Sequence, residues 1–172
     1  MVKDIIKLGI VLLLICGIST GLLAYVNFVT APVIAANSLK AQLVAKQDVM
    51  PEAETFEEID ENISLGKDEN GNTVGYAVSV KPFGYGGEIN MMVGVNSDLT
   101  ISGVKILSLS ETPGLGAKAQ DDSFLSQFVG KNKDLKLKED VEAISGATIT
   151  STAVTNGVKE AILLVENKGG NK

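Results

Sequence analysis

The chain has 172 residues, a formal net charge of −6, one cysteine (Cys16) and no histidine or tryptophan, and all of its basic residues are lysines. Without histidine, this polypeptide alone cannot build a Ser-His-Asp or Cys-His nucleophile system or bind zinc or haem through imidazole. A single cysteine excludes CxxC redox motifs and iron–sulfur cages, and the acidic balance argues against nucleic acid as a partner. Without arginine, an anion has to be held by backbone amides, helix ends or lysine.

The first predicted element is a membrane-spanning helix. Residues 8–29 are apolar apart from Ser19, Thr20 and Asn27, and no charged residue lies between Lys7 and Lys40. About 20 apolar residues, rising about 1.5 Å each, cross a hydrocarbon core roughly 30 Å thick. The sequence therefore predicts a short N-terminal segment, residues 1–7, followed by a transmembrane helix over residues 8–29.

Three other interpretations of this segment are considered. A cleavable signal peptide has a shorter apolar core of about 7–15 residues, although residues 30–32 and 35–37 leave cleavage open. A lipoprotein cleavage site at Cys16 would need a small residue where Ile15 stands. A type IV pilin would carry a glutamate near the start of the helix, and this chain has none there.

The lysines next to the span predict its orientation. Lys3 and Lys7 precede it, whereas the first lysine after it is Lys40. The positive-inside rule therefore places the N-terminus in the cytoplasm and the residues after about 30 on the periplasmic or extracellular side of the cell membrane. The exported part has no cysteine, so its stability has to come from burial and not from disulfides.

The segment 30–50 is expected to continue the helix as a stalk or first domain helix that ends at Pro51. Its apolar positions at helical spacing are Val33, Ile34, Leu39, Leu43 and Val44. The next stretch, 52–61, holds six carboxylates and no lysine. We interpret it as a solvated acidic face or an edge strand and not as a cation site, because nothing fixes these carboxylates around one centre.

Residues 51–172 are predicted to form a single α+β domain, since strands precede a terminal helix. Alternating apolar residues predict strands over 74–80 and 89–95, and the apolar run 99–109 predicts a third strand with a bulge at Gly103. Turns are expected at 68–71 and 96–98, where Asp, Asn, Ser and Gly cluster.

Three shorter predictions complete the domain. A short helix is expected over 123–128 and a short strand over 135–137. The last element is predicted as a helix from about residue 151 to 167, stopped by Gly169 and Gly170. Its apolar face consists of Val154, Val158, Ile162 and Val165.

Glycine-bearing loops are the candidate binding features, at residues 83–87, 111–116 and 145–148. None fits a nucleotide-binding formula such as GxGxxG or GxxxxGK[ST]. The third loop leads into the last helix, with Thr150 or Ser151 as the predicted N-cap. The free N–H groups and dipole of a helix start would stabilise a phosphate beside Thr148, but residue chemistry alone favours ordinary helix capping over a binding site.

The motifs nevertheless resemble those of a known family. Glu-Ala-Ile-Ser-Gly-Ala-Thr at 142–148, followed by Ile-Thr-Ser, resembles the flavinylation motif Dxx(S/T)GAT of FMN-binding domains. In that motif a flavin transferase joins FMN through a phosphoester to the last threonine. Ser-Glu-Thr-Pro-Gly-Leu-Gly-Ala-Lys at 110–118, with 124–130 after it, is similar to the second signature of the G subunits of the Rnf ion-translocating ferredoxin:NAD oxidoreductase. The turn at 84–89 also fits that family.

The chain departs from the family pattern at two positions. Glu142 stands where aspartate is usual, which keeps the charge and lengthens the side chain, and Ser110 stands where a histidine often precedes the loop. The C subunit of the sodium-pumping NADH:quinone reductase shares the flavin motif but is generally longer, so it is the second choice. A non-redox, membrane-anchored binding module is the remaining alternative.

The resemblance implies a set of FMN-binding residues and no metal or catalytic residue. Thr148 is the expected site of the covalent phosphoester. In the ETPGLG loop, Leu115 is expected to pack on the flavin ring, Thr112 to lie near its polar edge and Lys118 to offset the phosphate charge. The full set of expected FMN contacts is Glu111, Thr112, Pro113, Gly114, Leu115, Gly116, Lys118, Glu142, Ser145, Gly146, Ala147, Thr148, Thr150 and Ser151.

The same resemblance implies a non-autonomous subunit of a redox-driven ion-translocating oxidoreductase, and the lack of histidine and arginine favours an electron relay over a separate substrate-converting enzyme. Its partners would be the other membrane subunits of the Rnf complex, the lipid bilayer and, for maturation, a flavin transferase that acts on FAD. The protein would supply position and electrostatics, and FMN the redox chemistry. The single span has no acid or base after Lys7, so this subunit alone is not expected to move ions.

Overall fold

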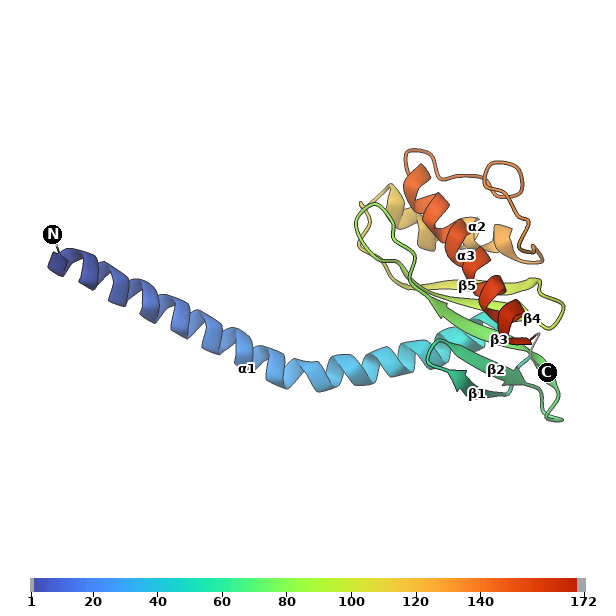
Figure 1. The fold of residues 1–172 in the computed structure, drawn as a ribbon, viewed down its shortest axis with the longest axis horizontal. Helices are drawn as coiled ribbons and strands as arrows, with labels where there is room; N and C mark the ends of the chain where they lie inside the picture. Colours follow the sequence, from blue (N-terminus) through green and yellow to red (C-terminus); the bar gives the residue numbers. More distant parts are fainter. Residues whose placement is uncertain (1, 170–172) are drawn as a thin grey trace. The chain divides into compact units, whose positions relative to one another are not determined.

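The computed structural model describes residues 2–169, which divide into two compact units on either side of the bond between Lys40 and Ala41 (Figure 1). Helix α1, Val2–Val49, contains an apolar window with a mean hydropathy of 2.3. It is the one helix among the described residues that is long and apolar enough to cross a membrane. The predicted apolar helix near the N-terminus is thus present.

The C-terminal end of α1 belongs to the second unit. As predicted, the helix ends before Pro51. The predicted continuation of the helix through 30–50 is present, and the five apolar residues at helical spacing are 58–63% exposed. The residues that this helix buries are instead Ala45, Lys46 and Val49, since only its last two turns pack against the sheet.

Five strands form one antiparallel sheet in the order β1-β2-β3-β4-β5. The chain order also matches the predicted α+β class, with the helix α3 after the strands. The strands are β1 Thr55–Asp60, β2 Ile63–Lys67, β3 Thr73–Val80, β4 Asn90–Asn96 and β5 Ile101–Ser108.

Three of these strands are the predicted ones, and the acidic stretch forms β1, at the edge of the sheet. Strand β2 has no counterpart among the predictions, because its five residues contain only two large apolar side chains, although the first four are all buried. The bulge expected at Gly103 lies one residue earlier, at Ser102. The pairing of β4 with β5 passes from Gly94↔Gly103 to Val95↔Ile101, so Ser102 has no paired residue in β4.

Short helical turns follow β5. They are the 3₁₀ turn η1 Gly116–Gln120, the helix α2 Asp122–Leu125 and the 3₁₀ turn η2 Ser126–Phe128. The last two confirm the short helix predicted over 123–128. The strand predicted over 135–137 is wrong: Leu137 makes only an isolated bridge to Val141, and Lys138, with a φ of 73°, turns the chain at once.

The terminal helix α3, Thr148–Gly169, lies across one face of the sheet (Figure 1). Its predicted apolar face is confirmed, since those four side chains are at most 2% exposed. The helix begins three residues earlier than predicted, so Thr150 and Ser151 lie inside its first turn and are not the N-cap. Gly169 is still helical, and Gly170 lies outside the described residues.

The sheet is buried on both faces. Alternate residues of a strand point to opposite faces, so Val78 and Met91 pack in the core beneath α3, while Ala77 and Met92 pack in the second cluster. That second cluster also contains Ala45, Val49, Met50 and Ala53. The domain is therefore held by α3 on one side of the sheet and by the end of α1 on the other.

Candidate functional site

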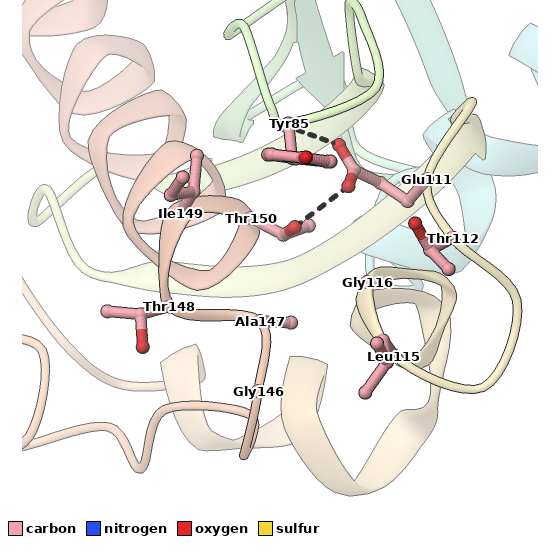
Figure 2. A pocket seen from close by; sticks show the side chains of 10 residues that line it. All are labelled: Tyr85, Glu111, Thr112, Leu115, Gly116, Gly146, Ala147, Thr148, Ile149 and Thr150. Carbon is pink, nitrogen blue, oxygen red and sulfur yellow. Dashed lines mark hydrogen bonds between the residues drawn. The ribbon is translucent and has the colours of Figure 1, made fainter.

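A pocket of about 520 Å³ lies where three segments meet: the β3–β4 loop, the loop after β5 and the start of α3 (Figure 2). This volume lies within the roughly 300–1,000 Å³ that is typical of cofactor sites. The pocket is lined by Tyr85, Glu111, Thr112, Leu115, Gly116, Gly146, Ala147, Thr148, Ile149 and Thr150. It therefore joins all three glycine-bearing loops of the sequence.

Thr148 is the first residue of α3, and its side chain is exposed. Within residues 2–169 its hydroxyl has no hydrogen-bond partner; only its carbonyl oxygen accepts a bond, from Thr152 Oγ1 at 2.8 Å. Figure 2 shows the Thr148 side chain on the open side of the helix start, away from Glu111. The hydroxyl is thus available to a group that enters the pocket.

The backbone at this helix start also presents free donors. The first helical hydrogen bond runs from Ser151 N–H to the carbonyl of Ala147, at 3.0 Å. Among the described residues, the N–H groups of Thr148, Ile149 and Thr150 therefore have no acceptor. Free N–H groups at the positive end of a helix dipole favour the binding of a phosphate. These groups could bind an anion in a chain that has no arginine.

The chain reaches this helix start through a tight turn. Gly146 has a φ of 78°, a conformation that glycine adopts without steric penalty. A Cβ there would lie 3.1 Å from Leu115 Cδ2, so the turn runs close to the loop after β5. Ser151 fixes the turn from inside the helix, because its Oγ accepts the Ile144 N–H at 3.0 Å and donates to the Ala147 carbonyl at 2.9 Å.

Glu111 is the charged side chain of the pocket lining, and only 7% of the residue is exposed. Its Oε1 accepts the backbone N–H groups of Tyr85 at 2.8 Å and Gly86 at 3.2 Å. Its Oε2 accepts the hydroxyl of Thr150 at 2.9 Å, and Figure 2 shows the Tyr85 and Thr150 bonds on either side of the carboxylate. This carboxylate is therefore engaged by donors from two other segments.

The sequence-predicted residues separate into two groups. Those that line the pocket are Glu111, Thr112, Leu115, Gly116, Gly146, Ala147, Thr148 and Thr150. Those that lie outside the lining are Pro113, Gly114, Lys118, Glu142, Ser145 and Ser151. Of the second group, Glu142 is exposed, and its N–H donates to Gln127 Oε1 at 2.8 Å, whereas Ser151 is fully buried in α3.

Two lining residues, Tyr85 and Ile149, are absent from the sequence predictions. Both offer apolar surface at the mouth of the pocket and are 73% and 57% exposed. Tyr85 stands in a glycine-rich loop, and an aromatic side chain between glycines is a signal that could have indicated it. Among residues 2–169, no group of three or more potential metal ligands comes together.

Comparisons with known proteins identify the class to which the chain belongs. Residues 84–163 match the FMN-binding domain family, and residues 1–49 match the RnfG N-terminal region. The fold is similar to the crystal structure of Shewanella oneidensis NqrC, with a TM-score of 0.53 and 24% identity over 67% of this chain and 68% of that one. The class is therefore an FMN-binding domain behind an apolar N-terminal helix.

Relatives that match over most of their length identify the family within this class. The chain is 36% identical to the G subunit of the Na⁺-translocating ferredoxin:NAD⁺ oxidoreductase complex of Acetobacterium woodii, over 96% of this chain and 93% of that protein. It is 37% identical to the proton-translocating counterpart of Clostridium ljungdahlii, over 91% and 89%. The chain belongs to the family of G subunits of the Rnf ion-translocating ferredoxin:NAD oxidoreductase complex. The resemblance stated from the motifs is thus confirmed.

Proposed function

We propose that this protein carries FMN in a phosphoester bond to Thr148 Oγ1 and relays electrons between other subunits of its membrane complex. The observation that carries the proposal is the exposed Thr148 hydroxyl at the edge of the pocket, without a partner among the described residues. Thr148 is also the last residue of the motif 142–148, inside the segment that matches the FMN-binding domain family.

The residues of the pocket fit both ends of such a cofactor. The free N–H groups of Thr148, Ile149 and Thr150 suit a phosphate, and the exposed side chains of Tyr85, Leu115 and Ile149 offer apolar surface for an aromatic ring. When bound, FMN supplies the reversible uptake and release of electrons. The covalent bond keeps the cofactor at the site where a dissociated molecule would be diluted away.

Attachment requires a second protein. Glu111 is the one carboxylate in the pocket lining, and both of its oxygens already accept hydrogen bonds. No histidine exists in the chain to activate the Thr148 hydroxyl. A separate flavin transferase that acts on FAD is therefore the proposed source of the phosphoester.

The ion path is assigned to other subunits. The apolar part of α1 after Lys7 has no acidic or basic residue before Lys40, and ionisable groups are what mark intramembrane ion paths. The names of relatives include both a sodium-translocating and a proton-translocating complex, so the ion differs within the family. This chain is therefore the membrane-anchored electron carrier, with the domain proposed to lie outside the cytoplasm.

The proposal is tested with Thr148→Ala, made in full-length protein that is produced together with a flavin transferase. After denaturing electrophoresis, the wild type should show a fluorescent band from attached flavin, and Thr148→Ala should show none. Thr152→Ala is the matched control, because Thr152 is also an exposed threonine of α3 and should keep the band. Fluorescence that survives in Thr148→Ala contradicts the proposal, and a wild type without flavin favours a non-redox binding module.

A further inference from the structure

Three segments that are distant in sequence converge on the Glu111 carboxylate. Glu111 itself begins the loop after β5, its Oε1 holds the β3–β4 loop through Tyr85 and Gly86, and its Oε2 holds the first turn of α3 through Thr150. The three hydrogen bonds span 26, 25 and 39 residues of sequence. Hydrogen bonds to a charged acceptor are about twice as strong as neutral ones.

The surrounding backbone is shaped to this carboxylate. A Cβ on Gly84 would collide with Glu111 Oε1, and a Cβ on Gly116 would lie 2.6 Å from Oε2 and 2.9 Å from Thr150 Oγ1. Real Cβ atoms do not approach other heavy atoms this closely, so both positions need glycine while Glu111 occupies its place. The carboxylate is therefore fitted on two sides by bare backbone.

The bond to Thr150 also sets the direction of Thr148. Residues of an α-helix are about 100° apart around its axis, so positions two apart differ by about 200°. With Thr150 turned inward to Glu111, Thr148 is turned outward, and Figure 2 shows these opposite directions. Rotating the first turn of α3 would move both side chains together.

We infer that Glu111 is a positioning residue that holds the three walls of the pocket at fixed separation and aims Thr148, instead of contacting the cofactor itself. The inference rests on the proposed attachment of FMN at Thr148. Both carboxylate oxygens are occupied by protein donors, and the residue is more than nine-tenths buried. A cofactor attached to Thr148 is then held in one orientation, because the walls of the pocket cannot shift.

The test compares Glu111→Ala and Thr150→Val in the full chain, with Thr150→Ser as the conservative rescue and Thr152→Val as the matched control. Amide hydrogen exchange of Tyr85 and Gly86 is measured in protein made without the transferase. Fluorescence anisotropy of the attached flavin is measured in protein made with it. The first readout follows the hydrogen bonds alone, and the second follows the orientation of the cofactor.

In Glu111→Ala, exchange at Tyr85 and Gly86 should be about tenfold or more faster, as expected when bonds to a charged acceptor are lost. In Thr150→Val the flavin anisotropy should fall, and Thr150→Ser and Thr152→Val should match the wild type. Thr150→Val replaces a hydroxyl by a methyl group of similar size. This variant therefore tests the inference even if Glu111→Ala does not fold.

Two results would overturn the inference. One is unchanged exchange at Tyr85 and Gly86 in folded Glu111→Ala, and the other is unchanged flavin anisotropy in Thr150→Val. If the wild type carries no flavin, the proposed function fails, but the exchange measurement on unloaded protein still decides whether Glu111 holds the loops. The two failures are therefore distinguishable.

Discussion

Gly116 illustrates at the level of one residue how closely the pocket wall is packed. Its bare backbone lies against the Glu111 carboxylate and the Thr150 hydroxyl, and an added methyl group would meet both. Gly114, two residues earlier, has open space around it and is glycine for another reason, a φ of 77°. Neighbouring glycines of one motif therefore serve different physical purposes.

Gly116→Ala is expected to lower the free energy of unfolding by about 1–3 kcal/mol, the usual effect of an extra methyl group in a packed region. The effect should be smaller in a Thr150→Ala background, because one of the two groups in the way is then absent. Denaturant unfolding of the two single variants and the double variant measures this coupling. Strictly additive effects would show that the contact with Thr150 does not matter.

The sequence predicts some residues of the site but not the hydrogen bonds between them. Thr148 and the ETPGLG loop follow from short motifs, because each motif is contiguous in sequence. The hydrogen bonds of Glu111 cannot be predicted from motifs, because its partners lie 25 to 39 residues away in the sequence. Two of these partners are backbone N–H groups, which every residue other than proline carries. Lys118 was expected near the phosphate, but this residue of η1 is not part of the pocket lining.

Among the elements, the β2–β3 hairpin depends on a charged turn. Asp68 accepts the side-chain amide of Asn72 and the backbone N–H groups of Asn72 and Asn70, at 2.8 to 3.0 Å. The side-chain hydrogen bond from Asn72 is the largest cause that holds the pKa of Asp68 below its ordinary value of 3.8. Ionised Asp68 therefore stabilises the folded hairpin.

Because the pKa is lowered by folding, this contribution is present above pH 3.8 and is lost as the pH falls through the lower pKa of the folded state. Asp68→Asn should therefore melt below the wild type at neutral pH, and the difference should shrink as the pH falls below 3.8. Thermal melting of both proteins over this range provides the measurement. A difference that stays constant with pH would contradict the assignment.

Element prediction succeeded where large apolar residues recur at a regular spacing over a long stretch, as in β3, β4 and α3. The predicted face of α3 is buried, whereas β4 is buried on both faces. The five-residue strand β2 and the buried end of α1 carry no such extended pattern. Val49 packs over the bare backbone of Gly94 and Gly103, and Ser102 Oγ donates to its carbonyl at 2.6 Å. A contact of this kind depends on small residues in distant strands and leaves no hydrophobic pattern in the helix.

For the whole molecule, the N-terminal helix is long and apolar enough to cross a membrane, and the orientation of the proposed anchor is predicted from Lys3 and Lys7. Protease added to intact cells or spheroplasts should therefore digest the domain, whereas a cytoplasmic marker protein in the same sample should stay intact. Immunoblotting against the C-terminal domain measures the loss. A domain that becomes sensitive only after lysis would reverse the orientation.

The central claim is the covalent bond between Thr148 and FMN, and peptide mass spectrometry tests it most directly. Trypsin, cutting after Lys138 and Lys159, releases residues 139–159, which contain the whole motif. On protein from membranes that hold the assembled complex, we predict this peptide to carry one FMN, localised by fragmentation to Thr148. An unmodified peptide as the main species, or FMN on another residue, would contradict the account.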